Sequence, residues 1–502
     1  MENSASSVYY GVSKPRIFLA SMIQSSNTLF KIAVGSLTYV ATGGFGLTVL
    51  LAGWIASAAR IFDGITDPIA AWFVPKVRSR FGVARPTIFM GYFLQLATVF
   101  LLYHVFPGKV SGAIGVVIYT ALYFINIIGY TLLNMGNELL QNTITNDPKK
   151  RPLVFRYSAT VTSLVTMVYS IYRTKILYPK YGEISVPYLQ ELSTIIFILA
   201  TIMVVVGLIA AAPADNAENF EKNFHGATKF KLKDIWNLVA HNPAFLSCFL
   251  SKATDKVASE TASNSAVNTL LFGIVIGNYA FSGDISVYNT IISLLLIWVV
   301  TGRAKKKGNA STYVRWSWIN IAIAIVTAVF MLVIDTTTIS VSIVPTVIFV
   351  ILFGIIRAFK SAMNASIGTL QADIVDYEFY LHGKYLGPLV SSVSNVLGKI
   401  FDSVSSVIIA WCLGMLGYTS TMPQPGDPMT NAVLWVTLIL WLGMPLLGSL
   451  ASVIAMHWYP LTKEKMEEVQ AANKLRREQN AEIYEAEERA AEKNAAVNSS
   501  RK

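Results

Sequence analysis

Long apolar runs, separated by short polar segments, repeat along the chain from about residue 17 to residue 458. A run of about 18–20 such residues spans the hydrocarbon core of a bilayer as a helix. Twelve runs therefore predict transmembrane helices at 17–42, 47–75, 86–106, 111–142, 153–178, 189–213, 242–277, 283–302, 312–334, 340–372, 386–418 and 431–458. Several exceed thirty residues and are expected to tilt or to extend past the bilayer surface. The predicted fold class is an all-α polytopic membrane protein.

The longest polar connection lies between the sixth and seventh runs and divides the chain into two six-helix halves. The predicted organisation is a cytoplasmic N-terminus (1–16), an N-terminal bundle (17–213), a central cytoplasmic loop (214–241), a C-terminal bundle (242–459) and a charged tail (460–502). A basic turn after the second run, KVRSRFGVARP, has a weak counterpart after the eighth, GRAKKKGNAS. Such paired halves are typical of transporters that hold their substrate near the midplane.

Positive charge in the connections predicts the orientation. Lys and Arg gather after the second, fourth and eighth runs, whereas the connections TGGFG, GNYAFSGD and DTTTISVS contain none. The cations of the opposite side are Lys109, Arg173, Lys175 and Lys180. Because basic loops stay in the cytoplasm during insertion, both termini are expected to lie inside, in a plasma or inner membrane. The first fifteen residues lack the apolar core of a cleavable signal, so the first helix is expected to act as an uncleaved one.

Composition narrows the function class. Hydrophobic residues make up 54% of the chain and charged residues only 14%. Much of the net charge of +11 is accounted for by the cytoplasmic loops, so we expect a bilayer and a small-molecule substrate as partners and no nucleic acid. Both cysteines lie in apolar runs, no phosphate-binding loop is present, and the five His are scattered. An enzyme, an ATP-driven pump and an organic cofactor are therefore not expected.

Two carboxylates stand inside the second apolar run. Each ionised Asp at the centre of a bilayer costs about 2.5–3.5 kcal/mol. Asp63 and Asp67 are four residues apart and share one helical face. Their negative charge needs a partner, which a bound Na⁺ or proton would supply. The alternative is a buried ion pair with Arg60, Lys31 or Lys399.

Three blocks of sequence resemble a known family. They are RIFDGITDP with the basic turn after it, GYTLLNMGNELLQNTITNDPKKR, and ADIVDYEFYLHGKYLGPLVSSVSNVLGK. In order and spacing they are similar to the glycoside–pentoside–hexuronide:cation symporters, the melibiose-permease branch of the major facilitator superfamily. The resemblance implies two pseudo-symmetric six-helix bundles and cation-coupled symport of a glycoside, pentoside or hexuronide by alternating access.

The resemblance also implies a cation site. The family's ligands fall here on Asp63, Thr66, Asp67 and Thr131. Ligation by oxygen alone suits hard cations such as Na⁺ or Li⁺, or a proton. If sodium is the coupling ion, Asp63 and Asp67 would be its charged metal ligands.

The implied substrate site departs from the family. Asn27 and Asn134 stand where relatives have carboxylates that accept bonds from sugar hydroxyls, and Glu138 replaces an aromatic platform. An amide still donates to and accepts from a hydroxyl. Glu138 would pair with an amine, with Arg156 or with a neighbouring helix. Arg156 resembles a substrate-contacting Arg, or else it is an interfacial residue whose charged end reaches the surface.

Further charges lie in the second half. Lys399 matches an intramembrane Lys of the family near both sites, and Ser394 and Asn395 are expected to face the same cavity. Lys256 and Glu260 have the i,i+4 spacing that allows a pair within one helix. The excess of charged and amide groups over a minimal sugar pocket hints at a charged substrate such as a uronide.

The basic turns also suggest a gate on the inner surface. Arg80 and Arg151 are predicted to form salt bridges with Asp373 and Asp376 when the cytoplasmic side closes. Breaking them would shift the population of conformations.

The function predicted is a cation-coupled secondary transporter of a glycoside. A carrier of lysophospholipid or another amphiphile would also suit the missing carboxylate pair. A membrane sensor or scaffold that signals through the charged tail is the alternative of another class.

Overall fold

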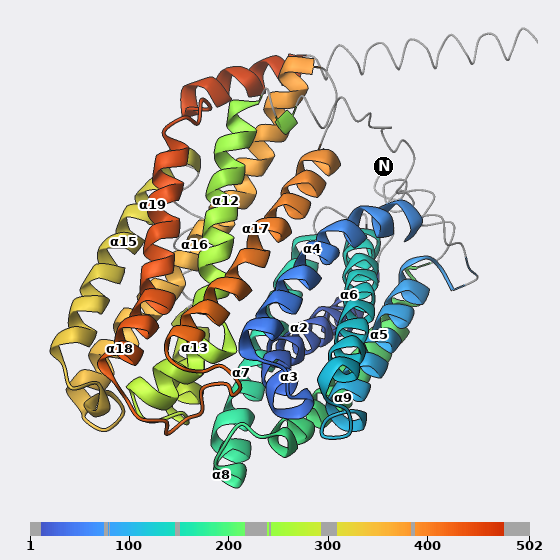
Figure 1. Cartoon of the computed structure of the whole chain (residues 1–502). Coiled ribbons are helices and arrows are strands. Elements are labelled where there is room, and N and C mark those ends of the chain that lie inside the picture. Colours follow the sequence, from blue (N-terminus) through green and yellow to red (C-terminus); the bar gives the residue numbers. More distant parts are fainter. Residues whose placement is uncertain are drawn as a thin grey trace, which may run out of the picture.

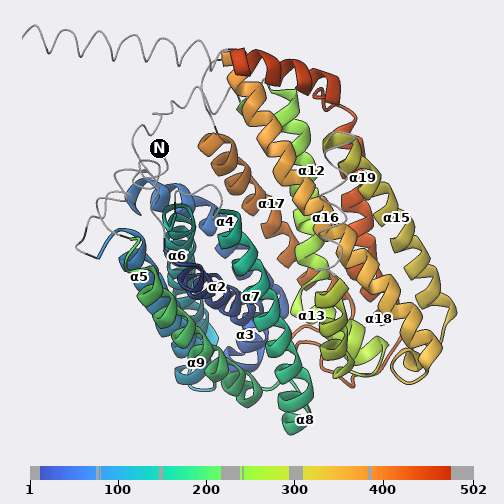
Figure 2. The same cartoon turned by 180° about the vertical axis from the view of Figure 1, so that it is seen from behind.

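The fold is seen in a computed structural model, which describes residues 12–74, 79, 81–145, 151–215, 238–239, 242–292, 309–382 and 387–475. These residues form two groups of helices that lie side by side (Figure 1, with the reverse view in Figure 2). The class predicted from the hydrophobic pattern, an all-α membrane protein with two bundles, is confirmed.

The first group contains nine α-helices and two wider π-helical turns. They are α1 (Lys14–Ala20), α2 (Met22–Gly35), α3 (Leu37–Phe45), α4 (Val49–Phe73), α5 (Ala84–Phe100), η3 (Leu101–Val105), α6 (Gly112–Thr143), α7 (Arg151–Ile171), η4 (Tyr172–Leu177), α8 (Tyr178–Tyr181) and α9 (Val186–Ala211).

The second group follows the same plan. It contains α12 (Pro243–Ala262), α13 (Ser265–Asn268), η5 (Thr269–Val275), a helix that begins at 281 and is described to 292, α15 (Asn309–Val333), η6 (Thr336–Ser340), α16 (Ile343–His382), α17 (Gly387–Met415), α18 (Asn431–Leu438), η7 (Ile439–Gly443) and α19 (Met444–Met456).

Within the described residues, nine helices are long and apolar enough to cross a membrane. The other three predicted spans, 153–178, 242–277 and 283–302, contain helices, but their described helices are too short or too polar to be counted among the nine. The helix α12 carries Lys252, Asp255, Lys256 and Glu260, and α7 with η4 carries several Arg and Lys. The eighth predicted span continues into residues 293–302, which lie outside the described part. In α12, Lys256 and Glu260 pair with each other, and Glu260 also contacts Lys31 of the first group.

Helix ends agree with the predicted spans to within a few residues, but the first and seventh spans are interrupted and the tenth is longer than predicted. The seventh span is broken between α12 and α13 at Ser263 and Asn264. The first predicted span is broken into α1, α2 and α3 near Ser21 and Ser36. The tenth runs to His382, ten residues beyond its predicted end. The apolar pattern shows neither feature. A short break in a helix leaves the sequence of apolar residues unchanged, and a helix that continues beyond the lipid is no longer apolar.

The two groups meet at the end of the molecule that the loop charges predict to be external, which we call the external end. Tyr39 Oη on α3 lies 3.0 Å from Thr269 Oγ1 and 3.1 Å from the carbonyl oxygen of Pro423. Lys175 Nζ and Asp284 Oδ1, also from opposite groups, are 2.5 Å apart. The two groups are therefore closed against each other at this end.

Small residues bring α4 and α17 into close contact near the external end. A Cβ atom at Gly53 would stand 2.5 Å from Cβ of Ala410 and 3.1 Å from the carbonyl oxygen of Ser406. Deeper in the molecule, a Cβ at Gly64 would lie 3.4 Å from the carbonyl oxygen of Val396. Close approach of backbones at small residues is the usual way that membrane helices associate. This contact holds the carboxylates of α4 against α17.

The predicted tail begins with a helix at residues 463–475, which lies across the opposite end of the second group. Met466 and Val469 are buried there, and Asn473 Nδ2 donates to the carbonyl oxygen of Asp376 (2.8 Å). The N-terminal segment before residue 12, most of the central loop and the tail after residue 475 lie outside the described residues.

Candidate functional site

Lys399 of α17 bridges the two carboxylates of α4. Its Nζ lies 2.8 Å from Asp63 Oδ1 and 2.7 Å from Asp67 Oδ2. The Asp63 side chain is 1% exposed and that of Asp67 19%. Three charges at such depth persist only when they neutralise one another. The ammonium therefore supplies part of the positive charge that the two carboxylates require.

Two hydroxyls complete the oxygen cluster. Thr131 Oγ1 on α6 donates to Asp63 Oδ1 (3.2 Å), and it lies 2.9 Å from Thr66 Oγ1. Thr66 Oγ1 also donates to the backbone carbonyl of Asp63 (3.0 Å). The four residues predicted to hold a cation thus converge, although no single stretch of sequence contains them all.

One oxygen of this cluster is unsatisfied. Asp63 Oδ2 is buried and has no hydrogen-bond partner among the described residues. A buried carboxylate oxygen without a donor carries a desolvation cost of about 1–3 kcal/mol or more. A cation or a proton at this oxygen would remove that cost. The cluster can therefore take up a positive charge in addition to, or in place of, the ammonium of Lys399.

The other counterions considered for the pair of Asp have different partners. Arg60 Nε lies 3.9 Å from Asp402 Oδ2, and Lys31 Nζ lies 3.2 Å from Glu260 Oε1. The predicted pair within one helix, Lys256–Glu260, is present at 2.7 Å. Of the three candidates, the structure brings Lys399 to Asp63 and Asp67.

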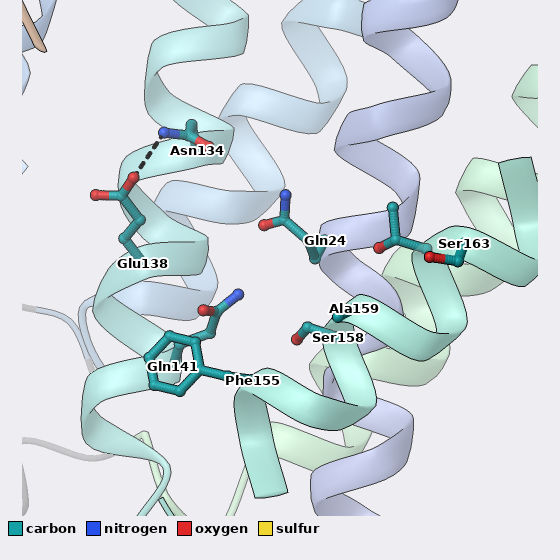
Figure 3. A pocket seen from close by; sticks show the side chains of 9 residues that line it. Gln24, Asn134, Glu138, Gln141, Phe155, Ser158, Ala159 and Ser163 are labelled. Carbon is teal, nitrogen blue, oxygen red and sulfur yellow. Dashed lines mark hydrogen bonds between the residues drawn. The ribbon is translucent and has the colours of Figure 1, made fainter. Parts of the chain in front are cut away.

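Three of the residues predicted to contact substrate form a hydrogen-bonded chain in the first group. Asn27 Nδ2 donates to Asn134 Oδ1 (3.1 Å), and Asn134 Nδ2 donates to Glu138 Oε1 (3.0 Å; Figure 3). Asn27 Oδ1 is buried and has no partner among the described residues. The chain thus retains an acceptor at one end and a carboxylate at the other.

Asn134 and Glu138 line a pocket of about 650 Å³ between α2, α6 and α7. The rest of its lining is Gln24, Gln141, Phe155, Ser158, Ala159, Thr162 and Ser163. Figure 3 shows Gln24, Gln141 and Ser158 pointing toward the same space. Amides and hydroxyls around an aromatic ring suit a polyhydroxylated ligand. Sequence reasoning missed Gln24 and Gln141, because a single amide in an apolar helix gives no pattern.

Three other predicted substrate residues, Arg156, Ser394 and Asn395, lie outside the lining of this pocket. Arg156 is exposed on α7. Ser394 is buried, and Asn395 is exposed and accepts from Lys252 Nζ (3.2 Å). Sequence reasoning also missed Tyr130, whose ring centroid lies 6.0 Å from Lys399 Nζ.

The predicted inner gate falls partly outside the described residues. Arg80 and the side chain of Arg151 are not described. Asp373 Oδ2 accepts from Asn309 Nδ2 (2.8 Å), within the second group. Burial raises the pKa of the Asp373 carboxyl to about 6, against the opposing effect of that hydrogen bond.

A second cavity, of about 350 Å³, lies between the two groups on the external side of the cation cluster. Lys31, Arg60, Arg173 and Glu260 contribute its charged lining. Most of its other lining residues are Ser, Thr or Asn. A polar cavity between the two halves is where paired-bundle transporters bind their cargo.

Comparison with known proteins identifies the family. Residues 20–463 match the family described as MFS/sugar transport protein. The chain is 31% identical over 116 residues to the putative glycoside/cation symporter YagG of Escherichia coli K12, which is 23% of this chain and 25% of that one. It is 30% identical over 128 residues to the inner membrane symporter YicJ of the same organism, 25% and 27% of the two chains. The matches to curated relatives thus span less than half of their length.

Solved structures share the fold. A mutant form of the nucleoside transporter NupG superposes with a TM-score of 0.58 at 15% identity, over 88% of this chain and 99% of that one. The tetrameric PepTSo2 gives a TM-score of 0.58 at 13% identity, over 89% and 99%. At such low identity these neighbours establish the fold alone.

Proposed function

The chain belongs to the MFS/sugar transport protein family, and we propose that it is a symporter that couples uptake of a glycoside-type sugar to Na⁺ or H⁺. Membership makes it a multi-pass membrane transport protein. The coupling ion, the sugar and the route of transport are our inference. The observation that carries it is the pair Asp63 and Asp67, which Lys399 bridges. The Thr131 hydroxyl donates to Asp63 Oδ1, and the Thr66 hydroxyl lies beside that of Thr131.

Coupling follows from competition for the two carboxylates. With no cation bound, the ammonium of Lys399 balances Asp63 and Asp67. A Na⁺ or proton that binds the carboxylates reduces their attraction for Lys399, which is then free to move. Because Lys399 belongs to the second half and both Asp belong to the first, cation binding changes the contact between halves. A ligand that favours one arrangement of the halves must then favour the cation as well.

A backbone oxygen is available near the same carboxylates. Pro68 lies inside α4, directly after Asp67. Proline has no N–H, so the carbonyl of Gly64, four residues earlier, lacks its helical donor. Freed carbonyls in interrupted membrane helices serve as ligands for Na⁺ or H⁺ in other transporters. Gly64 is thus a further candidate ligand beside the side-chain oxygens.

The conformation suits alternating access. The groups are joined at the external end through Tyr39, Thr269 and Pro423, while the pocket at Glu138 lies farther toward the opposite end of α6. With both termini inside, as the loop charges predict, this arrangement corresponds to a state closed to the outside. Rocking of the halves about the Lys399 contact would open the external end.

Ligand-induced stabilisation of the purified protein tests this function. A panel of glycosides and uronides is scanned with and without Na⁺, at two pH values. A sugar whose thermal shift grows with Na⁺ or with acidity, and which loses that growth in Asp63→Ala, supports the proposal. A shift produced by a lysophospholipid and by no sugar would instead favour an amphiphile carrier.

A further inference from the structure

The cavity between the two halves has more positive than negative charge around it. Its charged lining residues are Lys31, Arg60 and Arg173 from the first group and Glu260 from the second, and Arg173 lies on η4, which continues α7 at the external end. The cavity is separate from the oxygen cluster that Asp63 and Asp67 form. Two described acids near the cavity, Glu260 and Asp402, lie close to its cations.

One carboxylate serves two lysines. Glu260 Oε1 lies 3.2 Å from Lys31 Nζ and 2.7 Å from Lys256 Nζ. The Lys31 and Lys256 side chains remain 42% and 41% exposed, although both lie on helices at the centre of the molecule. A single carboxylate balances only one of them. The exposed surface of Lys31 faces the space between the halves, because Lys31 lines the cavity.

The next carboxylate is committed to another cation. Asp402, 2% exposed, faces Arg60 at 3.9 Å. Toward the external surface, Asp284 is paired with Lys175 at 2.5 Å. Neither acid is therefore available to the remaining guanidinium.

Arg173 is that guanidinium. Its Nε is buried and has no hydrogen-bond partner among the described residues. Its guanidinium carbon lies 5.6 Å from the centroid of the Tyr279 ring, and the described ion pairs give it no carboxylate. A cation–π contact offsets only part of the cost of burying a charge. Arg173 is among the residues that line the cavity. A guanidinium at such a position without a carboxylate partner points to an acceptor from outside the chain.

The charges around the cavity can be counted. Lys31, Arg60 and Arg173 line it, and Lys256 contacts the same Glu260 as Lys31. Against these four cations stand two acids, Glu260 and Asp402, so this set of described residues has two positive charges in excess. The hydroxyls and amides that surround them, such as Ser170, Ser263 and Asn268, are neutral and suit sugar hydroxyls.

We propose that Arg173, with Lys31 beside it in the lining, is an oxyanion subsite, and that the transported sugar carries a carboxylate or phosphate that binds there. The subsite would hold the acidic group while hydroxyls and amides of the cavity bind the ring. This inference rests on the proposed sugar transport and specifies its substrate class. It places recognition of charge on α7 and its π-helical end, away from Asn27, Asn134 and Glu138.

Matched sugars test the subsite. Binding of methyl β-D-glucuronide and methyl β-D-glucoside to the purified full-length chain is measured by calorimetry at fixed Na⁺ and pH, with glucose 6-phosphate as the phosphate arm. The glycosides differ only in the carboxylate. We expect one acidic sugar to bind at least about tenfold more tightly than the glucoside. Arg173→Gln should abolish that preference, and Arg173→Lys should keep part of it.

The control variant is Lys180→Gln, which removes a cation seven residues away that is paired with Glu191 on the surface (2.5 Å). It should leave the preference for the acid unchanged. Thermal unfolding of each variant shows that it is folded, and retained glucoside binding by Arg173→Gln would show that only charge recognition is lost.

The outcomes separate the two levels of inference. If the glucoside binds with a Na⁺-dependent affinity and neither acid binds better, the oxyanion subsite is wrong while sugar symport stands. If Arg173→Gln leaves the acid preference intact, the guanidinium serves only to hold Tyr279 at the external end and the assignment is overturned. If a lysophospholipid binds and no sugar does, both the oxyanion subsite and the proposed sugar symport are wrong.

Discussion

The ammonium of Lys399 lies 2.8 Å from the Oδ1 atom of Asp63, across the contact between the two halves of the molecule. This ion pair joins α4, which carries Asp63 and Asp67, to α17, which carries Lys399. A cation that competes for Asp63 therefore acts on the contact between the halves and not on one helix alone.

Removing Lys399 should make stability depend on the coupling cation. In Lys399→Met, Asp63 and Asp67 lose their shared counterion, which costs about 3–5 kcal/mol for an uncompensated buried charge. Na⁺ or mild acid should restore the lost stability, because either one neutralises the carboxylates. Thermal unfolding with and without Na⁺ at two pH values measures this. A variant as stable as wild type, with no response to Na⁺ or pH, would show that the ammonium is not their counterion.

A methyl group at Gly53 should open the external end. Gly53→Ala places its Cβ 2.5 Å from that of Ala410 in the present arrangement, and overpacking of this kind costs about 1–3 kcal/mol. The halves should separate there, and electron–electron spin distances between labels at Glu183 and Ser342 should lengthen. The matched control is Gly414→Ala on α17, where an added Cβ meets nothing within 4 Å. Equal distances in both variants would contradict closure through α4 and α17.

Asp373 should give the protein a pH-dependent stability. Burial raises the pKa of its carboxyl from 3.8 to about 6 in the folded state. The folded protein then binds more protons than the unfolded chain between about pH 4 and 6, so stability falls as pH rises through this window. Asp373→Asn should remove this slope, worth about 1 kcal/mol once solvent screening is allowed for.

The control for that slope is Asp335→Asn. Hydrogen bonds from the hydroxyl and the N–H of Thr337 lower the pKa of the exposed Asp335 carboxyl. The stability that the Asp335 carboxylate contributes is therefore lost only in more acidic solution, as the pH falls below about 4. If the slope between pH 4 and 6 persists in Asp373→Asn, another group is responsible for it.

Much of the fold was predictable from the apolar periodicity, because lipid demands long apolar runs and their ends are marked by polar turns. The breaks at Ser21 and Ser36 were not, since they interrupt hydrogen bonding and not the pattern of hydrophobicity. The carboxylate pair was found because charge is rare in such segments. The sequence left its counterion open among Arg60, Lys31 and Lys399, because tertiary packing decides which of these side chains contacts the two carboxylates.

The substrate region was less accessible to sequence reasoning. Asn27, Asn134 and Glu138 were chosen from a resemblance, and the structure joins them in one hydrogen-bonded chain. Gln24 and Gln141 gave no signal, because isolated amides have no spacing to detect. From the sequence, Arg173 is expected to be one of the cations of the outer loops. Its place in the lining of the cavity depends on how η4 packs against the second half, which the sequence does not show.

Gradient-driven uptake into proteoliposomes tests the central claim most directly, with the sugar that stabilises the purified protein and an inward Na⁺ or H⁺ gradient. Wild-type protein should accumulate the sugar, and Asp63→Asn should lose about tenfold or more of that accumulation while still exchanging sugar at equal concentrations on both sides. Asp335→Asn should behave as wild type. Undiminished, gradient-dependent accumulation by Asp63→Asn would contradict the assignment of Asp63 and Asp67 as the coupling site.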